Sequence, residues 1–181
     1  MNGGLIPRRY AKALYKFALQ EGSDRRGYEE MKSVVSAFES NADLNKVLAN
    51  PFIGNDDKRN LLLAAAGEDA SDAYRGFVRL VLENRREMFA YEMALAYRDI
   101  YRDAHGISMV RISTAVKMPQ VELDKLKALV QKSFTGRTLE YTYEVTPDII
   151  GGFVIDVDSV RMDASISNEL EQLRLTLLNS K

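Results

Sequence analysis

The fold class is decided by a stretch that reads Leu139-Glu-Tyr-Thr-Tyr-Glu-Val145, then Thr146-Pro147-Asp148, then Ile149-Ile-Gly-Gly-Phe-Val-Ile-Asp-Val157. Apolar and polar residues alternate in its first part. Because successive side chains on a strand point to opposite faces, this alternation predicts a strand with one apolar and one solvated face. Pro147 ends that strand, since it lacks a backbone donor. The pair Gly151-Gly152 then opens a second strand where the backbone bends or approaches another segment closely.

The segments on either side complete a small α/β domain. A turn at Asp158-Ser159 and a short return strand from Val160 follow, and Ser165 caps a last helix. Upstream, a strand over 107–115 and a helix opened by Pro119 precede the quoted stretch. The predicted order is strand, helix, three strands, helix, with the sheet covered by the terminal helix. The stripe that would cover it consists of Ile166, Leu170, Leu173 and Leu177.

The residues before Gly106 show helical periodicity and no strand pattern. Pro7 suits the first turn of a helix that Gly22 closes, Asn50-Pro51 stops a third helix, and Ser71 or Asp72 opens a fifth. Six helices with short joints are expected in all. The fold class is therefore α+β: a six-helix bundle over residues 1–105, followed by a small α/β domain over residues 106–181.

Composition narrows the function classes. The chain has 181 residues and a formal net charge of -1, from 25 basic and 26 acidic residues. Such a balance gives no electrostatic footprint for nucleic acid or for an anionic membrane. There is no cysteine, which excludes disulfides and thiolate metal sites. Apolar runs are too short for a membrane span, and no signal peptide is evident at the start. We expect a soluble protein that reaches a membrane only through partners.

Reactive groups are sparse. The only histidine, His105, lies in the last turn of a predicted helix, where a cation interacts favourably with the helix dipole. The aspartates at 148, 156, 158 and 163 follow the order of no calcium loop and are better explained as solvated strand and turn carboxylates. No serine elbow and no phosphate-binding loop is present. The sequence predicts no catalytic residue, no cofactor and no metal site.

The remaining signal is apolar surface on two helices. Helix one, from Leu5 to Phe17, and helix five, from Phe77 to Leu82, carry more apolar residues around their circumference than one buried stripe requires. A helix that is apolar on more than one side either lies centrally in a bundle or offers a groove to a partner. Periodicity alone leaves both interpretations open.

Several short motifs together resemble a known family. They are Arg9-Tyr-Ala-Lys-Ala-Leu14, Asn50-Pro51-Phe52-Ile53, Leu82-Glu-Asn-Arg85, Ile150-Gly-Gly-Phe-Val and Met162-Asp-Ala-Ser-Ile166. In this order and spacing they resemble the delta subunit of F-type ATP synthases, whose mitochondrial counterpart is the oligomycin-sensitivity-conferring protein. The resemblance spans essentially the whole chain. Four positions depart from the family pattern, namely Thr146, Asp156, Asp158 and Ala164, and the last two stand where the family frequently has glycine.

The resemblance implies a non-catalytic stator subunit of a proton- or sodium-translocating synthase. In this family the N-terminal bundle binds the N-terminal helix of an alpha subunit in a groove between helices one and five, and the C-terminal domain holds the C-terminal region of the peripheral-stalk b subunits. The protein would then sit on the cytoplasmic side of the inner membrane, or on the matrix side in mitochondria. Carried onto this sequence, the groove residues are Tyr10, Ala13, Phe17, Phe77, Leu80 and Val81.

Two other functions are compatible with the residues. An unrelated helical adaptor would use the same groove for a different amphipathic helix. A small enzyme would use Asp148, Asp156 or His105, and it would lose turnover when those residues are replaced. The stator interpretation predicts no intrinsic turnover.

Overall fold

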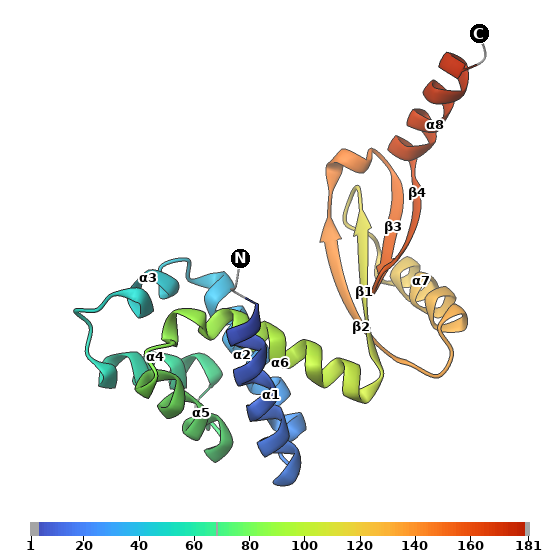
Figure 1. The fold of residues 1–181 in the computed structure, drawn as a ribbon. Coiled ribbons are helices and arrows are strands. Elements are labelled where there is room, and N and C mark those ends of the chain that lie inside the picture. The colour runs from blue at the N-terminus through green and yellow to red at the C-terminus, as the bar shows by residue number, and fades with distance from the viewer. Residues whose placement is uncertain (1–3, 68, 180–181) are drawn as a thin grey trace. The chain divides into compact units, whose positions relative to one another are not determined.

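The computed structural model describes residues 4–67 and 69–179 and divides the chain into two compact units, Met1–Ala104 and His105–Lys181. The division falls one residue before the predicted domain boundary. The described residues form eight α-helices, two short 3-10 helices and one four-stranded mixed sheet (Figure 1). The predicted α+β class is confirmed at this level. None of the helices in the described ranges has the length and apolar character needed to cross a bilayer.

The first unit contains helices and no strand among its described residues. Its core includes the fully buried side chains of Met31, Leu48, Leu62, Met93 and Tyr97. Helix contacts link α1 to α2 and α5, α2 to α4 and α5, and α4 to α5. The elements are α1 (Leu5–Gln20), α2 (Asp24–Ser40), α3 (Leu44–Ala49), α4 (Asn55–Ala66), α5 (Asp72–Glu83), η1 (Glu87–Phe89) and α6 (Ala90–His105).

The second unit is built around a sheet with the strand order β2-β1-β3-β4. Strands β1 and β2 run parallel because α7 provides the crossover between them. The pairs β1–β3 and β3–β4 are antiparallel, and only β3 and β4 form a hairpin. The elements are β1 (Ile107–Thr114), α7 (Gln120–Ser133), β2 (Thr138–Val145), η2 (Pro147–Ile149), β3 (Gly152–Val157), β4 (Val160–Ser165) and α8 (Ile166–Asn179).

The turn between β3 and β4 explains one departure from the family pattern. Asp158 adopts a positive φ of 49°, a conformation that usually favours glycine. Its carboxylate accepts a hydrogen bond from the Met109 backbone N–H at 3.1 Å and an ion pair from Arg137 at 3.0 Å. These two contacts hold the turn, so an aspartate can replace the expected glycine here.

The expectation that the terminal helix covers the sheet is wrong. The covering helix is α7, whose Val130 packs in one core with Val110 and Ile112 of β1, while no described side chain of α8 is buried. The reason is local: Ser165 ends β4 and Ile166 begins α8, so no loop is available to fold α8 back over the sheet. An amphipathic stripe in the sequence does not say whether its apolar face meets the same chain or another one.

Candidate partner-binding site

An apolar hollow lies between α1 and α5 of the first unit. Its volume is about 230 Å³, and every residue that lines it is apolar or aromatic apart from one glycine. A shape of this kind fits a helix that lays its apolar face into a groove, rather than a small polar substrate. The lining residues are Tyr10, Ala13, Leu14 and Phe17 of α1 and Ala73, Gly76, Phe77 and Leu80 of α5.

The hollow has a buried floor and exposed walls. Leu14 and Phe77 form the floor and are almost fully buried, whereas Phe17 on α1 and Leu80 on α5 are 48% and 45% exposed. A helix-helix contact fixes the distance between the two walls. Because close-packed floor residues resist displacement, the two exposed walls are held in place without a partner.

Five of the six predicted groove residues line this hollow, and the sixth does not. Val81 is 1% exposed and belongs to the core stripe of α5 together with Val78. On a helix, neighbouring residues point about 100° apart, so Leu80 and Val81 face different surroundings. Sequence reasoning missed Gly76 as a wall residue, although a glycine inside a helix is itself a signal.

A second hollow continues the groove toward the start of α1. Its volume is about 390 Å³, and it shares Tyr10, Ala13 and Leu80 with the first. The new lining residues are Ile6 and Arg9 on α1 and Arg86 beyond the end of α5. The two hollows together, called the groove below, extend along α1 from Ile6 to Phe17.

Arg86 reaches this position through the turn that ends α5. Arg85 takes a left-handed φ of 52°, its N–H donates to Leu82 O at 3.0 Å, and the Arg86 N–H donates to Val81 O at 2.9 Å. This pair of bonds is the Schellman arrangement, which usually places glycine or asparagine at the left-handed residue. The Asn84 side chain also donates to Leu80 O at 2.8 Å. The backbone therefore places Arg86 beside Leu80.

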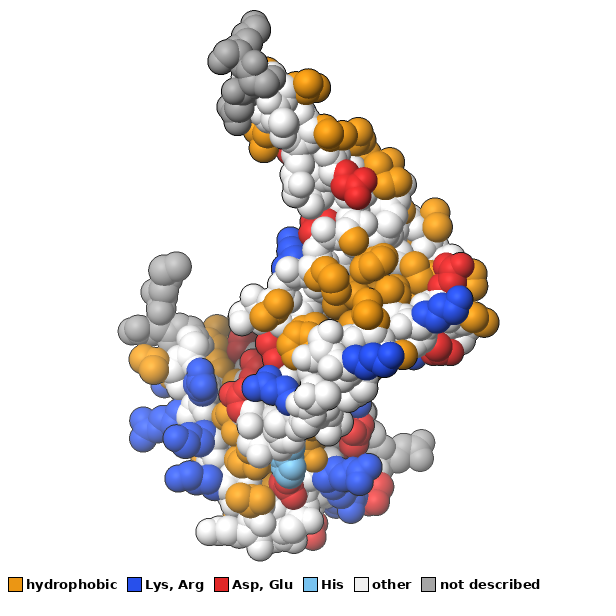
Figure 2. All heavy atoms as spheres, turned by 90° about the vertical axis from the view of Figure 1, so that its right-hand side faces the viewer, with side chains coloured by type: hydrophobic (Ala, Val, Ile, Leu, Met, Phe, Trp, Pro, Cys, Tyr) orange, Lys and Arg blue, Asp and Glu red, His pale blue; other side chains and the backbone are white. Residues whose placement is uncertain are grey.

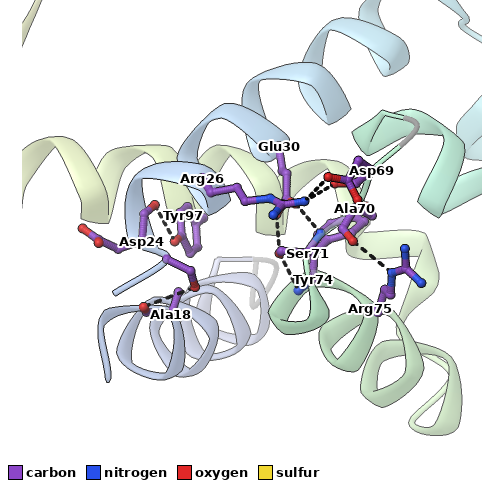
Figure 3. Close-up of polar contacts among 11 residues, drawn as sticks. Ala18, Asp24, Arg26, Glu30, Asp69, Ala70, Ser71, Tyr74, Arg75 and Tyr97 are labelled. Carbon is purple, nitrogen blue, oxygen red and sulfur yellow. Dashed lines mark hydrogen bonds and ion pairs between the residues drawn. The ribbon is translucent and has the colours of Figure 1, made fainter. Parts of the chain in front are cut away.

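A buried carboxylate anchors the other end of α5 (Figure 3). Glu30 of α2 is 6% exposed and accepts hydrogen bonds from the Ser71 backbone N–H and, at 2.8 Å, from the Ser71 hydroxyl. Ser71 in turn caps α5 by accepting from the Tyr74 N–H at 3.2 Å. Arg26 bridges Glu30 and Asp69 in the same cluster. The polar network thus fixes the start of the α5 wall against α2.

The residues that the enzyme interpretation would use do not line these two hollows. Asp156 binds Arg161 through two hydrogen bonds, and this guanidinium lowers the pKa of the Asp156 carboxyl below its usual value. The Ser165 hydroxyl and backbone N–H lower the pKa of Asp163 in the same way. Asp148 and His105 are exposed, one in η2 and the other at the end of α6. In the described part of the chain, no group of three His, Asp or Glu side chains could hold a metal ion.

A second apolar surface lies on the other unit. The stripe formed by Ile166, Leu170, Leu173 and Leu177 runs along α8, and these four side chains are between 44% and 73% exposed. In Figure 2 hydrophobic side chains gather along the part of the chain that leads to the C-terminus. A row of exposed apolar side chains of this kind is a candidate interaction surface.

The family model described as "ATP synthase delta (OSCP) subunit" matches residues 6–177. The chain belongs to this family. It is 34% identical over its full length to the ATP synthase subunit delta of Parabacteroides distasonis, covering all of both chains. It is also 30% identical to the delta subunit of Desulforamulus reducens, covering 97% of each chain.

A solved structure agrees with the fold. A chain of the Toxoplasma gondii mitochondrial ATP synthase superposes with a TM-score of 0.75 at 18% identity, covering 95% of this chain and 97% of the other. At this identity the likeness supports the architecture alone. The family assignment comes from the delta-subunit matches and confirms the resemblance seen in the sequence.

Membership in the delta family establishes the general role. The chain is a stator, or peripheral-stalk, subunit of an F-type ATP synthase, and it is structural rather than catalytic. Its partners are other subunits of that membrane-associated complex. The groove and the α8 stripe both present exposed apolar side chains.

Proposed function

We propose that the helical unit acts as a six-helix bundle whose groove holds the N-terminal helix of the synthase alpha subunit. The C-terminal unit binds the C-terminal region of the peripheral-stalk b subunits, with the α8 stripe as its main contact. The delta subunit would then tie the catalytic head to the stalk and resist rotor torque during ATP synthesis. This places it on the cytoplasmic side of the inner membrane, or on the matrix side in mitochondria.

The observation that carries this proposal is the pair of exposed side chains, Phe17 and Leu80, across a buried floor. From Ile6 to Phe17 the wall advances 11 residues, or about 16 Å at 1.5 Å per residue. A partner helix of about three turns would therefore fill the groove. Its apolar residues would recur at intervals of three and four, which is the pattern of a helix bound in a groove.

A stator needs tight and lasting binding more than it needs a reactive group. Full burial of a large apolar side chain contributes about 1.5–3 kcal/mol. Phe17 and Leu80 are each about half exposed, so a partner can still gain a large part of this from them. A preformed groove also limits the ordering cost of association. Both features favour slow dissociation, which is what resistance to torque requires.

The test is a calorimetric titration with a peptide from the N-terminus of the cognate alpha subunit. We expect saturable one-to-one binding to the full chain. Leu80→Asp should weaken binding about 30-fold or more, because it would bury an unpaired charge in the interface.

The matched control is Leu19→Asp. Leu19 lies on α1 and, at 53% exposed, is about as accessible as Leu80 on α5, but it does not line the groove. We expect binding within twofold of the wild type. Equal losses in the two variants would contradict the groove assignment. If the alpha peptide does not bind and another amphipathic helix does, the adaptor interpretation takes its place.

A further inference from the structure

The groove has an uneven charge. Two guanidinium groups, of Arg9 and Arg86, line it at the end near Ile6, one from each wall. No acidic residue lines either of its two hollows. The α1 wall adds to this asymmetry, because residues 5–20 contain Arg8, Arg9, Lys12 and Lys16 and no acidic residue.

The two guanidinium groups have no partner within the described residues. Over residues 4–67 and 69–179, no ion pair or side-chain hydrogen bond joins Arg9 or Arg86 to another group. Two other arginines of the same unit do have partners, since Arg26 contacts Asp69 at 2.9 Å and Arg59 contacts Asp56 at 3.3 Å. The cations at the groove end are therefore available to a bound molecule.

We propose that the groove selects a helix with acidic side chains beside its apolar face, and that Arg9 and Arg86 recognise those carboxylates. This inference rests on the proposed function and specifies the chemistry of the partner helix. The carboxylates of that helix lie in its terminal turn at the Ile6 end of the groove. Arginine suits the role because its fork of donors matches a carboxylate.

The position of Arg86 strengthens the argument. Its backbone is fixed by the turn that ends α5, so the start of its side chain is held beside the wall residue Leu80. A pre-positioned cation loses less freedom on binding than one on a mobile loop. Charges at the rim of an interface act mainly on the association rate, on its salt dependence and on partner choice.

The experiment uses three designed 15-residue amphipathic peptides and the full chain. The peptides share one apolar face and differ only in the residues flanking it at one end, which are Glu, Gln or Lys. We expect the Glu peptide to bind about tenfold more tightly than the Lys peptide at 50 mM salt, since each exposed ion pair is worth a few-fold in affinity. The difference should shrink to about twofold at 500 mM salt because of screening.

The second part of the experiment reverses the charges of the two groove arginines. In Arg9→Glu combined with Arg86→Glu, the order of the three peptides should invert. The control for the reversal at Arg9 is Arg8→Glu, which reverses one charge on the same turn of α1 at an exposed residue that does not line the groove. In that variant the original order should remain.

The results separate this inference from the proposed function. Equal binding of the three peptides, or equal effects of the reversals at Arg8 and at Arg9 with Arg86, would overturn the charge selection. The same holds if none of the peptides binds. If the Glu peptide is preferred and the alpha-subunit peptide does not bind, the charge selection stands and the assignment of the alpha subunit falls.

Discussion

The groove between α1 and α5 and the stripe on α8 are both apolar and exposed, yet they are built in different ways. The groove walls stand on buried residues such as Leu14 and Phe77, and α5 is fixed at its start by Glu30. The α8 stripe has no such support, because no described side chain of that helix is buried. The way an apolar surface can serve as a binding site therefore depends on whether buried residues support it.

The difference has a thermodynamic consequence. The groove needs little rearrangement to accept a helix, so its partner should meet a preformed site. Isolated helices of 14 residues are marginal in water, and α8 gains little from tertiary packing. We therefore expect α8 to gain much of its order when a partner covers the stripe.

The largest contrast between the two regions should come from truncating one leucine in each. Leu14→Ala removes part of the groove floor and should lower the free energy of unfolding by about 2–4 kcal/mol. Leu173→Ala, on the exposed α8 stripe, should change it by less than about 0.5 kcal/mol. Urea denaturation of both variants measures this. Similar losses would show that α8 is supported by the rest of its unit.

The polar anchor of α5 should give the next largest effect. Glu30→Ala leaves the Ser71 N–H and hydroxyl without their acceptor and should cost about 1–3 kcal/mol. Glu29→Ala, one residue earlier on the exposed face of α2, removes only a surface pair with Lys32 and should cost less than about 0.5 kcal/mol. Urea denaturation of the two variants measures the loss in free energy of unfolding. An equal loss in both would mean that the polar network does not stabilise the α5 wall of the groove.

The serines that cap α5 and α8 offer a closer comparison of the two regions. Ser71 caps α5, and Ser165 caps α8 by accepting from the Asn168 N–H at 3.2 Å. Each change to alanine removes about 1 kcal/mol of helix stability. Hydrogen exchange measures the protection of backbone amides. We expect Ser71→Ala to lower this protection throughout the first unit, and Ser165→Ala to lower it in α8 only. Spread of the second effect into the sheet would contradict an unsupported α8.

The smallest expected effect concerns a glycine in the groove wall. A methyl group on Gly76 would meet no atom within 4 Å, whereas one on Gly27 of α2 would lie 2.5 Å from the Tyr97 hydroxyl. Gly76→Ala should therefore stabilise the free protein by about 0.5–1 kcal/mol, since glycine is a poor helix former.

Two further variants complete the glycine comparison. Gly27→Ala should destabilise the protein. Gly76→Leu should fold but weaken binding of the alpha peptide by filling the groove. Thermal unfolding and titration measure both, and unchanged binding in Gly76→Leu would show that no partner approaches that wall.

The sequence allowed the architecture to be predicted well because periodicity and turn residues are local signals. The turn at Asp158-Ser159, the cap at Ser71 and the change of period near Gly106 all appear where expected. The left-handed backbone conformation of Arg85 was harder to predict, since arginine does not favour it. Only the backbone bonds at the end of α5 reveal it.

The site was predictable in part. Periodicity indicated which helices carry extra apolar surface, but it left a central position and a groove equally open. Leu80 and Val81 are neighbours of similar character, and only packing separates the exposed wall residue from the buried core residue. The cations of the groove, Arg9 and Arg86, are far apart in sequence, so their approach depends on how α1 and α5 pack.

The most direct test of the central claim asks whether one delta subunit binds head and stalk through two separate surfaces. Native mass spectrometry of the full chain with the alpha N-terminal peptide and a C-terminal segment of the b subunits should show a complex containing all three. Leu80→Asp should lose only the alpha peptide, and Leu173→Asp should lose only the b segment. Loss of both partners in either variant, or of neither in both, would contradict the account.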